Sequence, residues 1–255
     1  MQRYFVLPAR MTADTVTLEG DDARHLAQVM RAKPGDKFIA CDGTGREAVA
    51  QVAAISKDKI DADIIEERTA TSEMAWRVTV AQSLPKGDKL ETVIQKGTEA
   101  GAAAFLPILS RRTVVQYDER KEAKRVERWR KIAKEAAEQS HRGIVPEVMP
   151  VSSWKSLVSR FTSDYDLVLL CYEEEGRAGT GLKRVLGEFA AKDLAYPRVL
   201  IVVGPEGGFD EREAEEAVAA GAVAVGLGRR ILRTETAALY ALACVAFASG
   251  ELGGD

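Results

Sequence analysis

Histidine and cysteine are scarce in this 255-residue chain, and their scarcity excludes several kinds of site. The two histidines, His25 and His141, are too few for a His-rich zinc site, and a Ser-His or Cys-His hydrolase would need one of them as its base. No Gly-x-Ser-x-Gly motif accompanies them, so we expect both at surface or helix-end positions. The three cysteines (Cys41, Cys171 and Cys244) are far apart and odd in number, which favours buried reduced thiols over disulfides or a metal site.

Long hydrophobic runs are also lacking. The longest apolar candidate, residues 237–248, is too short to span a bilayer, and the N-terminus lacks the apolar core of a signal peptide. We therefore expect a cytoplasmic protein with no membrane segment. The net charge is only −3, but residues 73–145 are net positive while both flanking regions are net negative. A locally basic region is compatible with a phosphate-facing surface, although it is weaker evidence for nucleic acid than a basic chain would be.

The order of the expected elements divides the chain near residue 72. Residues 1–70 contain short β-runs at close spacing and one helical piece, a pattern typical of a small barrel. After a small, polar segment, strands alternate with helices, which predicts a parallel sheet. We therefore assign residues 1–72 to one domain and residues 73–255 to another.

A basic helix is expected over residues 119–142. Val126 and Trp129 belong to its apolar stripe, and the other faces carry more cations than acids. Many of these charges form solvated pairs along the helix, yet the surplus makes the helix a candidate for contact with a nucleic-acid backbone. In the first domain, Arg24 and Arg31 are placed to touch an anion, although solvated surface cations explain them equally well.

Two glycine-containing turns in residues 198–250 predict a small-molecule pocket. Each follows an expected strand, and turns at the carboxyl ends of parallel strands surround ligands in open α/β sheets. The first turn, Gly-Pro-Glu-Gly-Gly, is neither a dinucleotide-binding motif nor a phosphate-binding Walker A loop. Acids at the start of the next helix, among them Asp210 and Glu211, disfavour phosphate there and favour a cationic or neutral ligand. The alternative is that the glycines serve only the tight turn.

The second turn carries three arginines, Arg229, Arg230 and Arg233, beside the start of an Ala-rich helix. Cations at a helix N-terminus are unfavourable unless something pairs with them. We expect them to pair with Glu173, Glu206 or Glu235, or with a substrate phosphate. Thr234 is placed to cap a helix that begins at Glu235. That helix is apolar almost all round, so we expect the sheet to cover one side and another subunit the other.

The two turns resemble a known motif pair. GPEGGF followed by LGRRILRTETA looks like the cofactor-binding motifs of SPOUT-class RNA methyltransferases. SLPKGDKLETVIQKGTEAG, SRRTVV and EAAEQSHRGIVPEV are similar to the ribosomal RNA small subunit methyltransferase E family, and HLAQVMRAKPGD is like that family's PUA-like barrel. The resemblance covers nearly the whole chain in order. One departure is His141, at a position where the family often has glycine or another residue after Gln-Ser. The resemblance implies an α/β SPOUT domain with a trefoil knot and a mainly parallel sheet, preceded by a small N-terminal PUA-like RNA-binding β-barrel.

The resemblance also implies a function. The family consists of homodimeric enzymes that use S-adenosylmethionine to methylate N3 of one uridine in small-subunit (16S) ribosomal RNA, with the assembled 30S particle as the expected substrate. No metal ion is expected. By this resemblance the cofactor is bound by Leu170, Cys171, Tyr172, Glu173, Gly204, Glu206, Gly207, Gly208, Leu227, Gly228, Ile231, Leu232 and Arg233. The RNA is contacted by Arg24, Arg31, Lys86, Lys89, Arg111, Arg112, Gln139 and Arg142.

Catalytic roles follow from the acidity of the uridine N3–H. Transfer requires a base or stabilisation of the imide anion, so Arg233 is expected to stabilise an anion or phosphate. Glu235 or Glu99 is expected to act as base or hydrogen-bond acceptor. A catalytically silent RNA-binding module of the same architecture is the alternative, whereas the acidic helix start argues against an enzyme that uses ATP or NAD.

Overall fold

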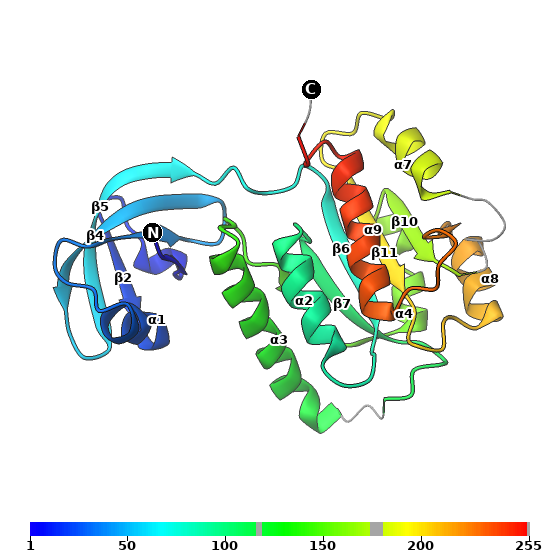
Figure 1. Cartoon of the computed structure of the whole chain (residues 1–255), viewed down its shortest axis with the longest axis horizontal. Coiled ribbons are helices and arrows are strands. Elements are labelled where there is room, and N and C mark those ends of the chain that lie inside the picture. The colour runs from blue at the N-terminus through cyan, green and yellow to red at the C-terminus, as the bar shows by residue number, and fades with distance from the viewer. Residues whose placement is uncertain (116–118, 174–180, 254–255) are drawn as a thin grey trace. The chain divides into compact units, whose positions relative to one another are not determined.

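The structure, a computed structural model, describes residues 1–115, 119–173 and 181–253, and the chain divides into two compact units (Figure 1). The first unit comprises Met1–Glu73 together with Lys134–Val145, and the second comprises Met74–Ala133 and Pro146–Asp255. Residues 134–145, which the sequence pattern places in the domain 73–255, therefore pack within the first unit. Polar contacts of their side chains and backbone with the first 73 residues hold them there.

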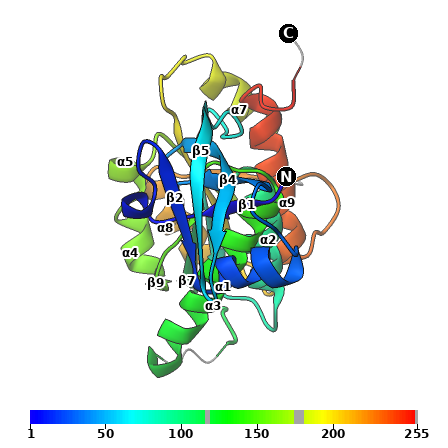
Figure 2. The same ribbon diagram turned by 90° about the vertical axis from the view of Figure 1, so that its left-hand side faces the viewer.

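The first unit is built on a five-stranded sheet in the order β1-β3-β4-β5-β2. Its strands are β1 (Arg3–Phe5), β2 (Thr15–Glu19), β3 (Lys37–Cys41), β4 (Arg46–Ile55) and β5 (Lys59–Thr69). The pair β1–β3 is parallel, and the other described pairs of this sheet are antiparallel. Strands β2, β5 and β4 lie side by side in Figure 2. The core of this unit includes Tyr4, Leu18, Phe38 and Ile60. Register shifts in the β4–β5 pair bend these two long strands, as bulges do.

The expected helical piece of the first unit is irregular. It consists of α1 (Gly20–Arg24) and a π-helical turn, η2 (His25–Val29), while a short 3-10 helix, η1 (Pro8–Arg10), precedes β2. Arg31 ends the segment with a φ of 55°, in the left-handed region. Both histidines are exposed, as expected. His141 has a φ of 61°, a backbone conformation that glycine adopts without strain. The backbone at this position would therefore favour glycine over histidine.

The second unit contains a parallel sheet in the order β12-β10-β11-β6-β7-β8, with β9 beside β7. Its strands are β6 (Arg77–Ser83), β7 (Ala104–Leu109), β8 (Glu147–Val148), β9 (Ser152–Ser153), β10 (Leu167–Cys171), β11 (Arg198–Val203) and β12 (Val223–Val225). Every strand pair recorded for this sheet is parallel, which confirms the predicted class. Because helices cover both faces (Figure 1), β7, β10 and most of β11 are continuous apolar runs rather than alternating ones, whereas β6 also carries the buried polar residues Thr79, Gln82 and Ser83.

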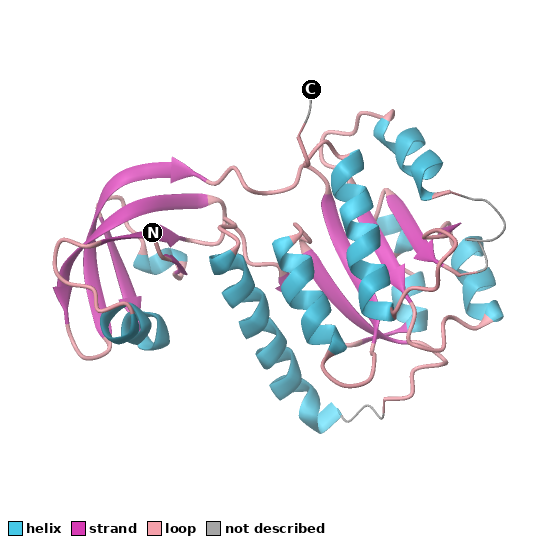
Figure 3. Cartoon of the chain, viewed as in Figure 1, coloured by secondary structure: helices cyan, strands magenta, loops and turns pink. Residues whose placement is uncertain are grey.

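The helices of the second unit are α2 (Lys89–Glu99), α4 (Trp154–Val158), α5 (Phe161–Asp164), α7 (Leu182–Ala190), α8 (Glu211–Ala219) and α9 (Thr234–Ala248). The long α3 (Glu119–Gln139) runs from the second unit into the first. Helices α2 and α9 lie side by side on one face of the sheet (Figure 3). Two of these helices, α4 and α5, are short and are separated by two residues. Among the described helices, none is long and apolar enough to cross a membrane.

The end of α3 is fixed to the first unit by polar contacts. Glu138 Oε1 accepts a hydrogen bond from the Phe5 backbone N–H at 3.2 Å, and it lies 3.6 Å from Lys134 Nζ. Lys134 Nζ also donates to Asp22 Oδ2 at 2.6 Å. Burial raises the pKa of Glu138 to about 7, because the pairing with Lys134 only partly offsets the loss of solvent and the repulsion from Asp22. The neighbouring Tyr4 hydroxyl also has a raised pKa, chiefly through burial.

This raised pKa predicts a pH dependence of stability. The folded state holds the Glu138 proton up to about pH 7, whereas the unfolded chain loses it near the ordinary carboxyl value. The stability contribution is therefore complete at low pH and is lost as pH rises through 7. The Glu138→Gln variant should be more stable than wild type at pH 8, by on the order of 1–3 kcal/mol, and should lose this advantage at pH 5. Scanning calorimetry at both pH values measures this, with the exposed Glu135→Gln as control. An equal response of both variants would contradict it.

Candidate functional site

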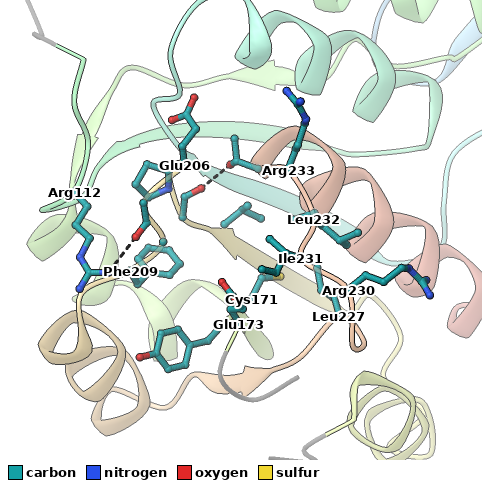
Figure 4. Close-up of a pocket in the computed structure, with 18 of the residues that line it drawn as sticks. Arg112, Cys171, Glu173, Glu206, Phe209, Leu227, Arg230, Ile231, Leu232 and Arg233 are labelled. Atoms are coloured by element: carbon teal, nitrogen blue, oxygen red, sulfur yellow. Dashed lines mark hydrogen bonds between the residues drawn. The ribbon is translucent and has the colours of Figure 1, made fainter. Parts of the chain in front are cut away.

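A cavity of about 650 Å³ lies at the carboxyl ends of β10, β11 and β12 (Figure 4). Its walls are the segment after β10, the loop from β11 to α8 and the loop from β12 to α9. The parallel sheet brings these three segments to one edge, since the carboxyl ends of parallel strands face the same way. The two turns that the sequence predicts around one pocket therefore line the same cavity in the structure.

Glycines shape the first wall. A Cβ at Gly204 would stand 3.2 Å from the Gly208 backbone carbon and 3.3 Å from the Phe209 ring, tighter than ordinary packing allows without displacement. Gly208 has a φ of 67° and Gly228, in the facing loop, a φ of 100°, both in the region that other residues rarely adopt. The loop residues Gly204, Gly207 and Gly208 consequently line the cavity, with no side chain between their backbone and a ligand.

Acidic side chains in the first loop are held in fixed positions. Glu206 Oε1 accepts hydrogen bonds from Lys89 Nζ at 2.5 Å and from the Lys86 backbone N–H at 3.0 Å. Partial burial alone would raise the pKa of Glu206, but these donors lower it below its usual range, so the side chain is a carboxylate. At the start of α8, Asp210 and the buried Glu213 form a reciprocal capping box. The positive end of α8 is therefore already occupied by carboxylates, as the sequence predicts.

The arginines at the cavity behave in two ways. Arg112 donates from Nη1 to the Gly207 carbonyl at 3.0 Å (Figure 4), and both Arg111 and Arg112 lie within ion-pair distance of Asp210. The second loop is different, because its three exposed arginines form no ion pair with any described residue. They are Arg229, Arg230 and Arg233. Glu206, one of their expected partners, pairs with Lys89 instead. Three cations beside the start of α9 are thus available to an anionic ligand.

Nearly all of the expected cofactor residues share this cavity. The exception is Leu170, which is fully buried within β10, behind the cavity wall. The cavity has further lining residues that the sequence does not assign to the cofactor. Two of them, Pro205 and Phe209, directly follow predicted glycines, so their position next to these glycines could have identified them. The additional residues are Lys89, Arg112, Val203, Pro205, Phe209, Glu211, Arg230, Thr234 and Ala237. Burial raises the pKa of Cys171 to about 12, so its thiol is neutral and contributes an uncharged surface.

The proposed acids and bases are placed differently. Arg233 lines the cavity, and its side chain is exposed. Glu99 ends α2 at the opposite end from Lys89, about 15 Å along the helix, and pairs with Lys96 at 2.8 Å. Glu99 does not line this cavity, and its role as base or hydrogen-bond acceptor stays a prediction. Glu235 does not line the cavity, although its buried Oε2 has no hydrogen-bond partner among the described residues.

The candidate RNA-binding residues also separate into groups. Arg142 is 3% exposed and pairs with Glu73, whose other donors include the Gly143 and Ile144 amides. The Arg142 guanidinium thus forms a buried ion pair within the first unit, and its expected contact with RNA stays a prediction. Arg24 pairs with Asp21 and with Asp58. The remaining exposed candidates without an ion pair in the described parts of the chain are Arg31, Lys86 and Gln139.

Both units match families of known proteins. The family model for an RNA methyltransferase domain matches residues 72–246, and that for an RNA methyltransferase PUA domain matches residues 18–65. The chain is 44% identical to the ribosomal RNA small subunit methyltransferase E of Bacillus subtilis over 100% of both chains. It is 36% identical to the protein of that name from Mycobacterium tuberculosis, covering 92% of this chain and 87% of the relative.

Solved structures show the same fold. A ribosomal RNA small subunit methyltransferase E from Neisseria gonorrhoeae, bound to S-adenosyl methionine, superposes with a TM-score of 0.83 and 32% identity over 97% of each chain. A methyltransferase from Legionella pneumophila, in complex with the same cofactor, gives 0.82 and 26% over 97% of this chain and 98% of its own. The expected SPOUT α/β architecture with a PUA-like N-terminal unit is therefore confirmed.

Proposed function

The chain belongs to the ribosomal RNA small subunit methyltransferase E family, and on that premise we propose that it transfers a methyl group from S-adenosylmethionine to N3 of one uridine in small-subunit (16S) ribosomal RNA. It is an S-adenosylmethionine-dependent ribosomal RNA methyltransferase, as indicated by 44% identity over the full length to a ribosomal RNA small subunit methyltransferase E and by the similar structure bound to S-adenosyl methionine. The observation that carries the proposal is the cavity formed by the two family motifs at one edge of the parallel sheet.

The cavity suits this cofactor. S-adenosylmethionine is a sulfonium cation carrying an adenine, so it requires backbone hydrogen bonds, apolar cover and no competing cation at its centre. The glycine loop offers exposed backbone, Leu227, Ile231 and Leu232 offer apolar cover, and Glu206 is a carboxylate. The carboxylates that cap α8 oppose a phosphate at that position. When bound, the cofactor supplies the methyl group.

The chain's own contribution to the reaction is to hold the uracil and its charge. Loss of the N3 proton leaves an imide anion, which a guanidinium stabilises more than it stabilises the neutral base. Arg233 is suited to this role because it lies at the cavity and has no ion-pair partner among the described residues. Glu235 lies in the first turn of α9, close to Arg233 in sequence. We retain Glu235 or Glu99 as the proposed base or hydrogen-bond acceptor; as base, this carboxylate would take the N3 proton.

Contact with RNA is proposed for exposed cations of both units. Arg31 and Lys86 are available without breaking an ion pair to a described residue, and Gln139 offers an exposed amide. Arg24, Lys89, Arg111 and Arg112 are engaged with carboxylates, so each would exchange a protein partner for a phosphate. Breaking the ion pair within the protein reduces the binding free energy that each phosphate contact contributes. The release of RNA counterions still favours binding.

A homodimer is part of the proposal. Helix α9 buries one face against the sheet and α2, yet Tyr240 and Phe247 are 42% and 74% exposed. These positions are seven residues, or about two helical turns, apart on the same side, so they form an apolar stripe suited to a second copy of the chain. We further propose that the dimer acts in the cytoplasm on the assembled 30S particle, where small-subunit ribosomal RNA presents a folded target.

The test is transfer of labelled methyl from S-adenosylmethionine to ribosomal RNA. We expect label in small-subunit RNA, more in assembled particles than in free RNA, and none in large-subunit RNA. Digestion to nucleosides should place the label in N3-methyluridine. Label in neither form of small-subunit RNA would refute the proposal, and RNA binding without transfer would instead support the silent module.

A further inference from the structure

A buried amide lies behind the cavity at the end of β6. Gln82 is 1% exposed and is the penultimate residue of that central strand. Its Nε2 donates to Thr234 Oγ1 at 2.8 Å, to the Ser83 carbonyl at 3.0 Å and to the Gly204 carbonyl at 3.3 Å. Two of these acceptors are carbonyls, so the amide must present its NH₂ group to them. One side chain thus contacts two residues that line the cavity.

The Thr234 hydroxyl completes this arrangement. It donates to the Gly204 carbonyl at 2.6 Å, and Thr234 is only 7% exposed. The sequence predicts that Thr234 caps α9, but the structure gives the N-cap position to Arg233, which makes no side-chain capping bond. The Thr234 hydroxyl is instead directed to the loop that follows β11. It therefore joins the two loops that form facing walls of the cavity.

Stability alone does not explain the amide. Gln82 Oε1 is buried and has no hydrogen-bond partner among the described residues, so half of the amide group loses its solvation without replacement. An apolar side chain of similar shape would avoid that loss. Buried polar groups retained in this way are commonly tied to a specific geometry.

We propose that Gln82 and Thr234 are positioning residues of the cofactor site. Their shared hydrogen bonds to Gly204 hold the β11–α8 loop against the start of α9, so the cavity exists in its binding shape before the cofactor enters. Both act through the Gly204 backbone, since the Thr234 hydroxyl and the Gln82 NH₂ are already committed to protein acceptors. The inference rests on the proposed function, because it concerns affinity for S-adenosylmethionine.

The Thr234→Val variant tests the proposal. Valine keeps the shape but removes the hydroxyl, so the two loops are released and only a fraction of molecules has the binding shape. We expect the Kd for S-adenosylmethionine, measured by titration calorimetry, to rise about tenfold, which corresponds to about 1.4 kcal/mol. KM for the cofactor should rise by the same factor, with a smaller change in kcat. The Thr234→Ser variant keeps the hydroxyl and should restore the wild-type Kd.

Two comparisons separate positioning from general stability. Thr98 is a buried threonine whose hydroxyl donates to Ile94 O within α2, and Thr98→Val should lower the unfolding temperature without changing the Kd. Gln82→Leu should also weaken binding, and combining it with Thr234→Val should weaken binding by less than the product of the two single effects. Wild-type affinity in Thr234→Val would overturn the proposal, as would a multiplicative double variant. Failure of the wild-type protein to bind the cofactor would instead refute the proposed function.

Discussion

Replacing Gly204 with valine is expected to weaken binding of S-adenosylmethionine at least a hundredfold, or by about 2.7 kcal/mol. The first added carbon alone would stand 3.2 Å from the Gly208 backbone, and the branched methyl groups have no space between that loop and the Phe209 ring. The loop must move, and its carbonyl then loses the hydrogen bonds from Gln82 and Thr234. Titration calorimetry with the purified variant measures the change in Kd.

A matched glycine provides the control for this experiment. Gly187 lies within α7, and a Cβ there would meet nothing within 4 Å. Valine has a better helix propensity than glycine, so Gly187→Val should keep α7 folded. Because the substitution displaces no neighbouring atom, the variant should bind the cofactor as wild type does. If Gly204→Val remained folded and bound with wild-type affinity, the β11–α8 loop would not form the cofactor site.

Replacing Arg233 with alanine is expected to lower kcat by about 10² to 10³, the range typical for removal of one group that stabilises transition-state charge. The side chain is exposed and has no described ion-pair partner, so its removal should leave the unfolding temperature within about one degree of wild type. Single-turnover transfer of labelled methyl to small-subunit particles measures the chemical step. The Kd for the cofactor should change much less than kcat.

The pH profile distinguishes charge stabilisation from simple RNA binding. Without the guanidinium, the pKa of the bound uridine N3–H is expected to rise, so the variant should regain more rate than wild type as pH increases. Arg233→Lys keeps the charge and should recover part of the activity, whereas Arg229→Ala, which is outside the cavity lining, should affect only RNA affinity. Equal losses in Arg233→Ala and Arg229→Ala with parallel pH profiles would remove Arg233 from the mechanism.

The sequence predicts the location of the site better than the interactions inside it. The glycine turns and the parallel sheet follow from local patterns, so Gly204, Gly208 and Gly228 can be assigned to one pocket from the amino-acid sequence alone. The hydrogen bonds of Gln82 cannot be predicted in this way, because they join β6 to segments more than a hundred residues away. A threonine before a helix favours capping locally, and only the tertiary contact redirects the Thr234 hydroxyl.

Charged residues show a second limit. Arg142 and Arg31 are indistinguishable as cations in sequence, yet one is buried against Glu73 and the other is exposed in a left-handed conformation. The acidity of the uridine N3–H suggests a chemical role for Glu99, but the sequence alone does not show that Glu99 and Lys89 lie at opposite ends of α2 and that only Lys89 lines the cavity. Burial and the direction of a helix are properties of the whole fold, so single-residue chemistry does not reveal them.

The first unit is discontinuous in sequence, because it includes residues 134–145, and this affects how the chain folds during synthesis. Synthesis proceeds from the N-terminus, and a domain folds as a unit only after all of its segments have left the ribosome. When Glu73 emerges, the partners that Phe5 and Arg3 require, Glu138 and the Arg142 carbonyl, have not been translated. Folding of the N-terminal unit therefore cannot be completed until the first part of the second unit and residues 134–145 have been synthesised. The two units of this enzyme are consequently expected to mature together during translation, and not one after the other.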